Sequence, residues 1–453
     1  MFGKTKKIHF TGIGGIGMSG MAEVLLNFGF SVSGSDLNAT EITKKLVKLG
    51  ARIEIEHNPD LVKGADVLVY SSAVKSDNLE VQRAQELRIP VIRRAEMLGE
   101  ISRLKENCIA IAGTHGKTTT TSMVGEIFTK AALDPLVIVG GVVKNIGSNS
   151  RLGAGNTIVV EADEFDRSFL TLTPTLAVIT TLESEHLDIY SDLEDLKNTF
   201  TKFANQVPFY GAVVVCHDEE TLMDIIPHLI RRVITYGYST QANVRAENVK
   251  FSDGGAAFDV SFNGAQLGEF HLHLPGDHNV KNALASIAIG LEYGVKLDDI
   301  KNGISSFSGV HRRFEIVNET DGILFVDDYA HHPTEVKATL SAAKNGWNRR
   351  VIAVFQPHLY SRTQQFYKEF GRSFMDADML VVTEIYPARE EPIDGITGEI
   401  VADAAKEFGH QNVHYFSDNK GIVDFLNSKL QNHDMVITLG AGDIWKIHEQ
   451  WKR

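Results

Sequence analysis

The chain has few cysteines and no long apolar run. Only two of its 453 residues are cysteines, Cys108 and Cys216, so a disulfide framework is excluded and a reducing compartment is favoured. The longest apolar runs, such as residues 136–143, are much shorter than the ~18 residues of a membrane span. No apolar stretch of signal-peptide length follows the lysines near the N-terminus. We therefore expect a cytoplasmic protein that does not contact a membrane.

The chain also has no excess of positive charge. Its 45 lysines and arginines face 58 acidic residues, which gives a net charge of −13. This balance argues against nucleic-acid binding, which relies on a basic surface. It does not exclude small anionic ligands, because loops and helix ends can bind phosphates locally.

What the sequence does contain is short β-branched runs that alternate with helical stretches. This pattern predicts an α/β protein with parallel sheets, and the length suggests about three domains. Polar connectors at residues 103–107 and 318–322 place the domains at 1–106, 107–320 and 321–453. Within the middle domain, polar and apolar residues alternate over 243–274 around Asp-Gly and Asn-Gly turns, which predicts a small antiparallel excursion.

A glycine-rich loop follows the first predicted strand. Gly12, Gly14 and Gly17 precede a helical stretch at 18–28, and Asp36 ends the next strand. Such glycines allow a tight turn and a close backbone approach to a diphosphate, while the acidic residue can bind a ribose. The loop predicts a bound nucleotide diphosphate without saying which one. Taken alone it suggests an NAD-dependent oxidoreductase, and a turn that serves only the chain geometry is the other alternative.

A second loop has the features of a phosphate loop. It lies between a strand ending at Ala112 and a helical run at 120–132, and its residues are Gly113, Thr114, His115, Gly116, Lys117, Thr118 and Thr119. In such a loop the amides wrap the phosphates, the lysine neutralises their oxygens and a threonine hydroxyl reaches Mg²⁺. Because Ile111 replaces the usual first glycine, the loop is a shortened variant. A triphosphate site here is hard to reconcile with a simple dehydrogenase.

Acidic residues follow two further predicted strands. The strand at 157–160 runs into Glu161–Glu164, and the strand at 176–180 precedes 183–188, which includes His186. Carboxyl ends of parallel strands meet on the same rim of a sheet. Oxygen ligands suit Mg²⁺, and a neutral imidazole can complete a second metal site. The alternative is that these acids are solvated loop residues.

At this point the chain resembles the Mur ligase family, the ATP-dependent enzymes that build the peptidoglycan stem peptide. The matching blocks span essentially the whole chain, at residues 12–20, 113–119, 161–166, 183–190, 275–283, 309–314, 327–333, 355–358 and 386–392. The last three of these blocks are similar to the branch of the family that adds L-alanine.

The resemblance implies three domains with separate ligands. A Rossmann-like first domain would hold UDP-N-acetylmuramate, a central domain of the phosphate-loop ATPase type would hold ATP, and a Rossmann-like third domain would hold L-alanine. The implied UDP-sugar residues are Gly12, Gly14, Gly17, Asp36 and Ser71. Asn282 and Arg313 would join the phosphate loop in binding ATP. The implied amino-acid residues are Tyr329, His331 and Arg362. Relatives can carry arginine where this chain has Leu359.

The resemblance also implies the reaction. The muramoyl carboxylate would attack the γ-phosphate of ATP, and the resulting acyl phosphate would react with the amine of alanine, in peptidoglycan precursor synthesis. Lys117, Glu161 and His186 would be the catalytic residues, with Thr118, Glu161 and His186 as Mg²⁺ ligands. The alternatives are a recycling ligase that attaches a tripeptide, the NAD-dependent oxidoreductase, and a non-catalytic nucleotide-binding regulator. The sequence leaves monomer and homodimer open.

Overall fold

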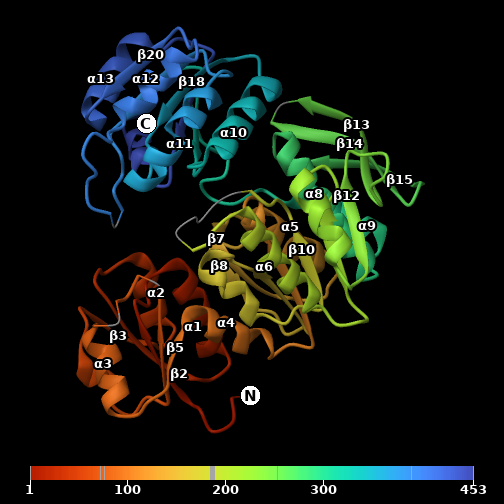
Figure 1. Ribbon diagram of the computed structural model, residues 1–453, viewed down its shortest axis with the longest axis vertical. Helices are drawn as coiled ribbons and strands as arrows, with labels where there is room; N and C mark the ends of the chain where they lie inside the picture. Colours follow the sequence, from red (N-terminus) through yellow and green to blue (C-terminus); the bar gives the residue numbers. More distant parts are fainter. Residues whose placement is uncertain are drawn as a thin grey trace. The chain divides into compact units, whose positions relative to one another are not determined.

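The protein folds around three β-sheets. The computed structural model describes residues 2–71, 73–75, 77–183, 189–252, 254–388 and 390–451. Parallel pairing dominates each sheet, and helices alternate with the strands along the chain (Figure 1). The predicted α/β class is therefore confirmed.

The chain divides into two compact units. The first holds residues 1–247, 259–270 and 281–307, and the second holds 248–258, 271–280 and 308–453. The strands and the helix that cross between these ranges contribute residues to both units. The boundaries predicted after residues 106 and 320 stay predictions.

The N-terminal sheet has five parallel strands in the order β3-β2-β1-β4-β5. The chain leaves the central strand β1 toward β2 and later returns on its other side at β4. The glycine loop that follows β1 therefore lies at the point where the strand order reverses, where α/β sheets bind ligands. The elements, in the red to orange part of Figure 1, are β1 (Lys7–Thr11), α1 (Ile16–Asn27), β2 (Ser31–Asp36), α2 (Glu41–Lys48), β3 (Arg52–Ile55), η1 (Pro59–Val62), β4 (Val67–Tyr70), α3 (Leu79–Glu86), β5 (Val91–Arg93) and α4 (Arg94–Ser102).

The second sheet has ten strands in the order β15-β14-β13-β12-β11-β10-β6-β9-β7-β8. Strand β6 lies between β10 and β9 and is parallel to both, so the residues that follow these three strands share one rim. The elements are β6 (Asn107–Ala112), α5 (Lys117–Lys130), β7 (Leu136–Val143), β8 (Ser148–Arg151), β9 (Thr157–Glu161), η2 (Phe165–Thr171), β10 (Leu176–Ile179), α6 (Leu193–Asn205), β11 (Ala212–Cys216), α7 (Glu220–Ile225), η3 (Ile226–His228), β12 (Val233–Gly237), β13 (Val244–Ser252), β14 (Gly255–Phe262), β15 (Ala265–Leu272), α8 (Asp277–Glu292) and α9 (Leu297–Ser306).

The predicted antiparallel excursion is strands β13 to β15. They are neighbours in chain order at the edge of the sheet, and two residues separate each from the next. A two-residue connection can join only antiparallel strands. The Asn263-Gly264 turn has positive φ at both residues, 49° and 83°, which is typical of a type I′ hairpin.

The C-terminal sheet has six strands in the order β16-β17-β21-β18-β19-β20, all parallel to their neighbours except β16. Helix α10 begins at Pro333 with His332 as its N-cap, a position where the fixed φ of proline favours a helix start. The elements are β16 (Glu315–Thr320), β17 (Ile323–Asp328), α10 (Pro333–Gly346), β18 (Arg350–Phe355), α11 (Tyr360–Ser373), β19 (Met379–Thr383), α12 (Glu399–Glu407), β20 (Val413–Phe416), α13 (Asn419–Lys429), β21 (Asp434–Leu439) and η4 (Ile444–Trp451).

The structure also bears on the two cysteines and on the apolar runs of the sequence. Cys108 and Cys216 are both free and buried. Across the described ranges, no helix combines the length and apolar character needed to cross a membrane.

A buried carboxylate joins the strands of the N-terminal sheet. Glu80 in α3 is fully buried, and it accepts hydrogen bonds from the hydroxyls of Thr11 and Ser35 at 2.7 Å each. It also accepts from the Asn58 amide at 2.9 Å and from His9 Nε2 at 3.2 Å. Burial alone would raise the pKa of Glu80, but His9 and the two hydroxyls together lower it below its ordinary value. The ionised carboxylate therefore holds together β1, β2 and the loop after β3.

We expect Glu80→Gln to lower the free energy of unfolding by about 2–3 kcal/mol, because a charged acceptor is replaced by a group that brings a donor toward two hydroxyls. Urea unfolding at neutral pH measures this effect. Glu86→Gln on the same helix is the matched control. Glu86 pairs with Arg83 and is 64% exposed, so its change should cost less than about 0.5 kcal/mol. Equal effects of the two substitutions would contradict the role given to Glu80.

Candidate active site

The phosphate loop after β6 requires glycine at two positions. Gly113 has φ +128° and Gly116 has φ +81°, a backbone region that other residues rarely adopt. A Cβ at Gly116 would lie 2.4 Å from Asn282 Oδ1, and one at Gly113 would lie 2.1 Å from Thr180 Oγ1. Asn282 also accepts a hydrogen bond from Thr120 Oγ1 at 3.2 Å. The structure thus places Asn282 directly against the loop, as expected for a nucleotide-binding residue.

Lys117, the first residue of α5, folds back over the loop. Its Nζ donates to the carbonyl oxygens of Gly113 at 2.6 Å and Thr114 at 3.1 Å. It also lies 2.9 Å from both carboxylate oxygens of Glu164, a residue that is 2% exposed. The ammonium group of Lys117 is therefore held at the N-terminus of α5, where it is paired with the buried Glu164, three residues after the neighbouring strand β9.

Burial and the nearby acidic residues determine the charge states of Lys117 and Glu164. Burial disfavours the charged form of Lys117, but Glu164, Asp163 and Glu161 outweigh it and raise the pKa of Lys117 above its ordinary value. Burial raises the pKa of Glu164 to about 7, against the lowering effect of the Lys117 ammonium. Lys117 thus stays a cation, while Glu164 can change its charge near neutral pH.

Thr118 and Glu161 also meet, as predicted. Thr118 Oγ1 donates to Glu161 Oε2 at 2.9 Å, and the Gly140 amide donates to the same oxygen at 2.8 Å. A hydroxyl beside a carboxylate at a phosphate loop is a donor set that suits Mg²⁺. Thr119 is buried behind them. His186, expected to complete a second metal site with Glu161, lies outside the described residues.

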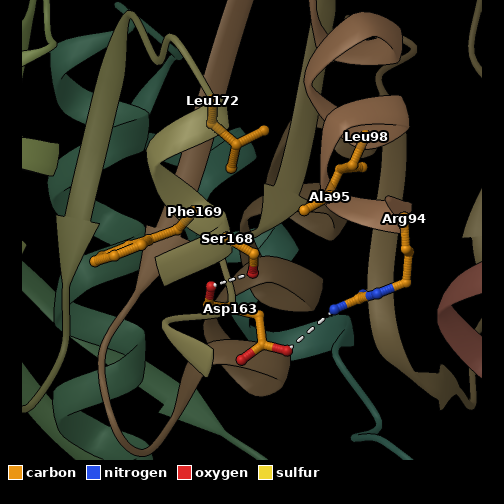
Figure 2. A pocket seen from close by; sticks show the side chains of 7 residues that line it. All are labelled: Arg94, Ala95, Leu98, Asp163, Ser168, Phe169 and Leu172. Carbon is orange, nitrogen blue, oxygen red and sulfur yellow. Dashed lines mark hydrogen bonds and ion pairs between the residues drawn. The ribbon is translucent and has the colours of Figure 1, made fainter. Parts of the chain in front are cut away.

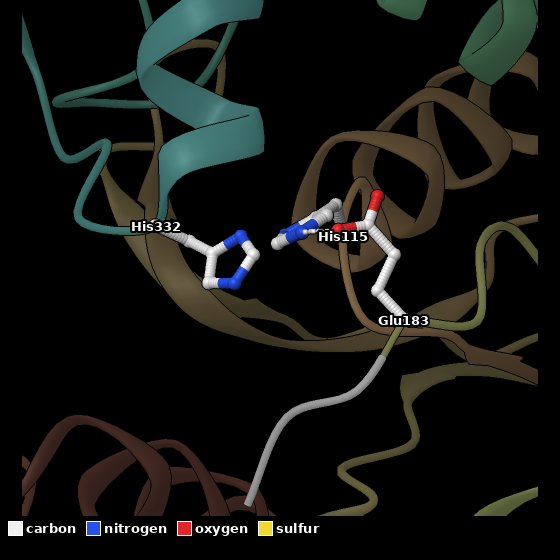
Figure 3. Close-up of side chains that lie close together, drawn as sticks. All are labelled: His115, Glu183 and His332. Atoms are coloured by element: carbon white, nitrogen blue, oxygen red, sulfur yellow. Dashed lines mark ion pairs between the residues drawn. The ribbon is translucent and has the colours of Figure 1, made fainter. Parts of the chain in front are cut away.

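The segment after β10 is hydrogen-bonded to the phosphate loop. The His115 amide donates to Thr181 Oγ1 at 2.9 Å, and the Glu183 amide donates to Thr114 Oγ1 at 2.9 Å. The side chains of His115 and Glu183 approach to 3.6 Å and lie side by side in Figure 3. His332, also drawn there, belongs to the second compact unit. The hydroxyl of Thr181 thus helps to hold the phosphate loop in place.

The glycine loop after β1 is closed by the predicted residues. The Gly14 amide donates to Asp36 Oδ2 at 2.8 Å, so Asp36 anchors the loop itself. A Cβ at Gly12, where φ is +79°, would lie 3.4 Å from Ser71 Oγ. Gly12, Gly14, Asp36 and Ser71 are therefore close together at the carboxyl edge of the sheet. Gly17 follows in the first turn of α1.

Arg94 connects this loop to the acid run 161–164, a link that the sequence analysis missed. A Cβ at Gly17 would lie 2.8 Å from Arg94 Nη1, and Arg94 Nη2 is 3.2 Å from Asp163 Oδ2. Both residues line a small pocket together with Ser168, whose hydroxyl donates to the Asp163 carbonyl (Figure 2). The only sequence signal was a pair of arginines at the start of a helix.

Three predicted residues meet at the end of β17 in the second unit. The Arg313 guanidinium lies 5.4 Å from the Tyr329 ring, and the ring of His331 lies 5.1 Å from that of Tyr329. Arg313 Nη1 is 3.3 Å from Glu335 Oε1. Although burial opposes the charge, Glu335 and Asp328 raise the pKa of Arg313 above its ordinary value.

Rings continue from His331 along the carboxyl edge of this sheet. His358 lies 5.8 Å from His331 and 6.0 Å from Tyr386, measured between ring centroids. Arg362 lies half-buried in the first turn of α11. Leu359 caps this helix with φ 69° and ψ 135°, a conformation that costs a non-glycine residue about 1–3 kcal/mol. No role had been assigned to His358 or Tyr386 from the sequence.

Comparisons with known proteins cover nearly the whole chain. Three family models match: "Mur ligase family, catalytic domain" at 7–106, "Mur ligase middle domain" at 111–290 and "Mur ligase, glutamate ligase domain" at 312–442. The UDP-N-acetylmuramate–L-alanine ligase of Geotalea uraniireducens is 52% identical over 99% of this chain and 98% of its own length. The protein of that name from Salinibacter ruber is 51% identical over 99% of this chain and 94% of its own length.

Solved structures agree with these matches. The UDP-N-acetylmuramate–alanine ligase of Thermotoga maritima superposes with a TM-score of 0.83 at 31% identity, over 98% of each chain. A murein peptide ligase from Psychrobacter arcticus superposes with a TM-score of 0.72 at 25% identity, over 98% of each chain. With three family models that together match most of its length and relatives about 50% identical over the full chain, the chain belongs to the Mur ligase family.

Proposed function

We propose that this protein is an ATP-dependent ligase that joins L-alanine to the lactyl carboxylate of UDP-N-acetylmuramate, in peptidoglycan precursor synthesis. The observation that carries the proposal is its identity of about one half, over the full length, to curated proteins named for that reaction. The murein peptide ligase structure is more distant, at 25% identity, so a tripeptide-attaching ligase is the less favoured alternative.

The geometry of the phosphate loop supports this reaction. A carboxylate is a poor electrophile, and phosphorylation by ATP turns one of its oxygens into a leaving group. The carboxylate oxygen forms a bond to the γ-phosphorus as ADP leaves, and the amine of alanine then displaces phosphate from the acyl carbon and loses a proton. The Lys117 ammonium and the loop amides are placed to hold the charge of the transferring phosphoryl group.

A magnesium ion fits the oxygen pair of Thr118 and Glu161. Bound there, Mg²⁺ would neutralise charge on the phosphate oxygens. Glu161 is held in place by the Gly140 amide, and Thr118 by its position in the first turn of α5. By resemblance, His186 would bind a second ion together with Glu161.

The other predicted site residues keep their roles in this proposal. Gly12, Gly14, Gly17, Asp36 and Ser71 would bind the UDP group, and Gly113 to Thr119 with Asn282 and Arg313 would bind ATP. Tyr329, His331 and Arg362 would hold L-alanine. Domains at 1–106, 107–320 and 321–453 would carry the three ligands, in a cytoplasmic protein.

The acceptor distinguishes this activity from the alternatives. With ATP, Mg²⁺ and UDP-N-acetylmuramate present, we expect phosphate release to depend on L-alanine and to be at least about tenfold slower with a tripeptide, because a site built for one residue excludes a longer acceptor. A coupled phosphate assay measures both rates. Faster release with the tripeptide would identify a recycling ligase. A change in nicotinamide absorbance without phosphate release would identify an oxidoreductase.

Lys117→Ala should lower ligation by about 10³-fold or more, because it removes the main positive charge at the transferring phosphoryl group. Glu164 then loses its partner, but its raised pKa lets it bind a proton, so we expect the fold to persist. Steady-state rates and circular dichroism measure the two effects. Lys130→Ala, at the far end of the same helix, is the control: Lys130 is 42% exposed and pairs with Glu126. Near-normal ligation by Lys117→Ala would reject the assigned role.

Glu164 should make ATP binding depend on pH. Below its pKa of about 7 the carboxyl is neutral and leaves the Lys117 ammonium to the phosphates. Above that pKa the carboxylate competes with them. We therefore expect the KM for ATP to rise between about pH 6 and pH 8, and Glu164→Gln to remove this rise while keeping the part caused by titration of ATP itself. The same pH profile in both proteins would contradict this competition.

A further inference from the structure

Arg94 occupies the space that a side chain at residue 17 would fill. It is the first residue of α4, and its guanidinium lies against the first turn of α1. A Cβ at Gly17 would lie 2.8 Å from Arg94 Nη1, 3.3 Å from its Cδ and 3.6 Å from its Cζ. The glycine at this position therefore admits an arginine to the start of the helix.

Within the described part of the chain, several hydrogen-bond donors meet at this point without a protein acceptor. Helix α1 begins at Ile16 with no side-chain cap and no acidic residue in its first turn. Among the described residues, nothing accepts from the amides of Ile16 and Gly17 or from Arg94 Nη1. The Arg94 side chain is 29% exposed, so a ligand can reach it. Free amides at a helix N-terminus beside an arginine favour a phosphate.

The other edge of the same guanidinium faces the acid run after β9. Arg94 Nη2 lies 3.2 Å from Asp163 Oδ2 (Figure 2). Asp163 is one of the carboxylates that raise the pKa of Lys117. A planar guanidinium can serve two anions through two edges, so one arginine can contact both a diphosphate at the glycine loop and an acid of the phosphate-loop site.

Arg94 could also serve only to link α4 to the segment after β9, and its neighbour Arg93 makes it possible to test this. Its neighbour Arg93 also forms an ion pair across the same two segments, with Asp166. Arg93 is 59% exposed, and the atoms nearest to a Cβ at Gly17 belong to Arg94 and not to Arg93. Arg93 thus pairs with the segment after β9, as Arg94 does, but it does not lie against Gly17 as Arg94 does. It is therefore a matched control for Arg94.

We propose that Arg94 binds the diphosphate of the sugar nucleotide at the glycine loop, while its other edge pairs with Asp163. The inference rests on the proposed function, because that function places a uridine diphosphate at the glycine loop. It adds a ligand-binding residue, contributed by α4, to the loop itself.

Binding of UDP and of uridine to the purified full chain, without ATP or alanine, tests the proposal. Calorimetry measures UDP affinity, and NMR line broadening measures the weaker uridine binding. We expect Arg94→Ala to weaken UDP binding by about tenfold or more and to leave uridine binding unchanged, because only UDP carries phosphates. Arg94→Lys should recover part of the loss, since it keeps the charge without the planar fork. Arg93→Ala should bind UDP like the unmodified protein.

The outcomes separate this inference from the proposed function. Equal weakening of UDP and uridine by Arg94→Ala, or equal effects of Arg93→Ala and Arg94→Ala, would overturn it, because a structural link gives those patterns. Asp163→Asn should keep the affinity for UDP, and a loss equal to that of Arg94→Ala would also overturn it. Unmodified protein that binds UDP but releases no phosphate with alanine would contradict the proposed function alone.

In turnover, the same substitution should act on one substrate. We expect Arg94→Ala to raise the KM for UDP-N-acetylmuramate by a factor similar to its loss of UDP affinity, with a much smaller change in the KM for ATP. An unchanged KM for the sugar nucleotide would count against the proposal.

Discussion

The buried ion pair of Lys117 and Glu164 organises the phosphate loop and the acids around it. A lysine needed for phosphate binding must stay charged and in place before any phosphate arrives. Glu164 and the carbonyl oxygens of Gly113 and Thr114 meet this need by accepting from the ammonium. The surroundings are thus organised in advance for a ligand that brings its own negative charge.

This pair is possible because of the order of the strands. β6 carries the phosphate loop, and its neighbour β9 ends at Glu161, three residues before Glu164. The other neighbour, β10, leads to Thr181 and Glu183, which hydrogen-bond the loop. Parallel pairing brings these three carboxyl ends to one rim, so that Lys117, Glu164 and the hydrogen-bonded pair of Thr118 and Glu161 share one rim of the sheet.

The glycine loop of the N-terminal sheet differs from the phosphate loop in the groups that surround it. Its loop has glycines and an uncapped helix start, and it has no lysine. Asp36, which in a dinucleotide site binds a ribose, here accepts from the Gly14 amide and closes the loop. The positive charge near this loop comes from Arg94 on another helix. The glycine pattern alone therefore suggests an oxidoreductase, whereas the full-length similarity to Mur ligases favours a ligase.

Local patterns in the sequence were enough to predict the α/β class, and they also pointed to the two glycine-containing loops and to Thr118 and Glu161, which the structure brings together. These features are local: glycines at fixed spacing, a lysine at a helix start and acids at strand ends each carry their own signal. Three contacts became visible only in the folded chain: Glu164 pairs with Lys117, Asn282 fills the space beside Gly116, and Arg94 reaches both Gly17 and Asp163. Those partners are tens to more than a hundred residues apart. Their contacts follow from strand order and helix packing, which no local pattern of residues specifies.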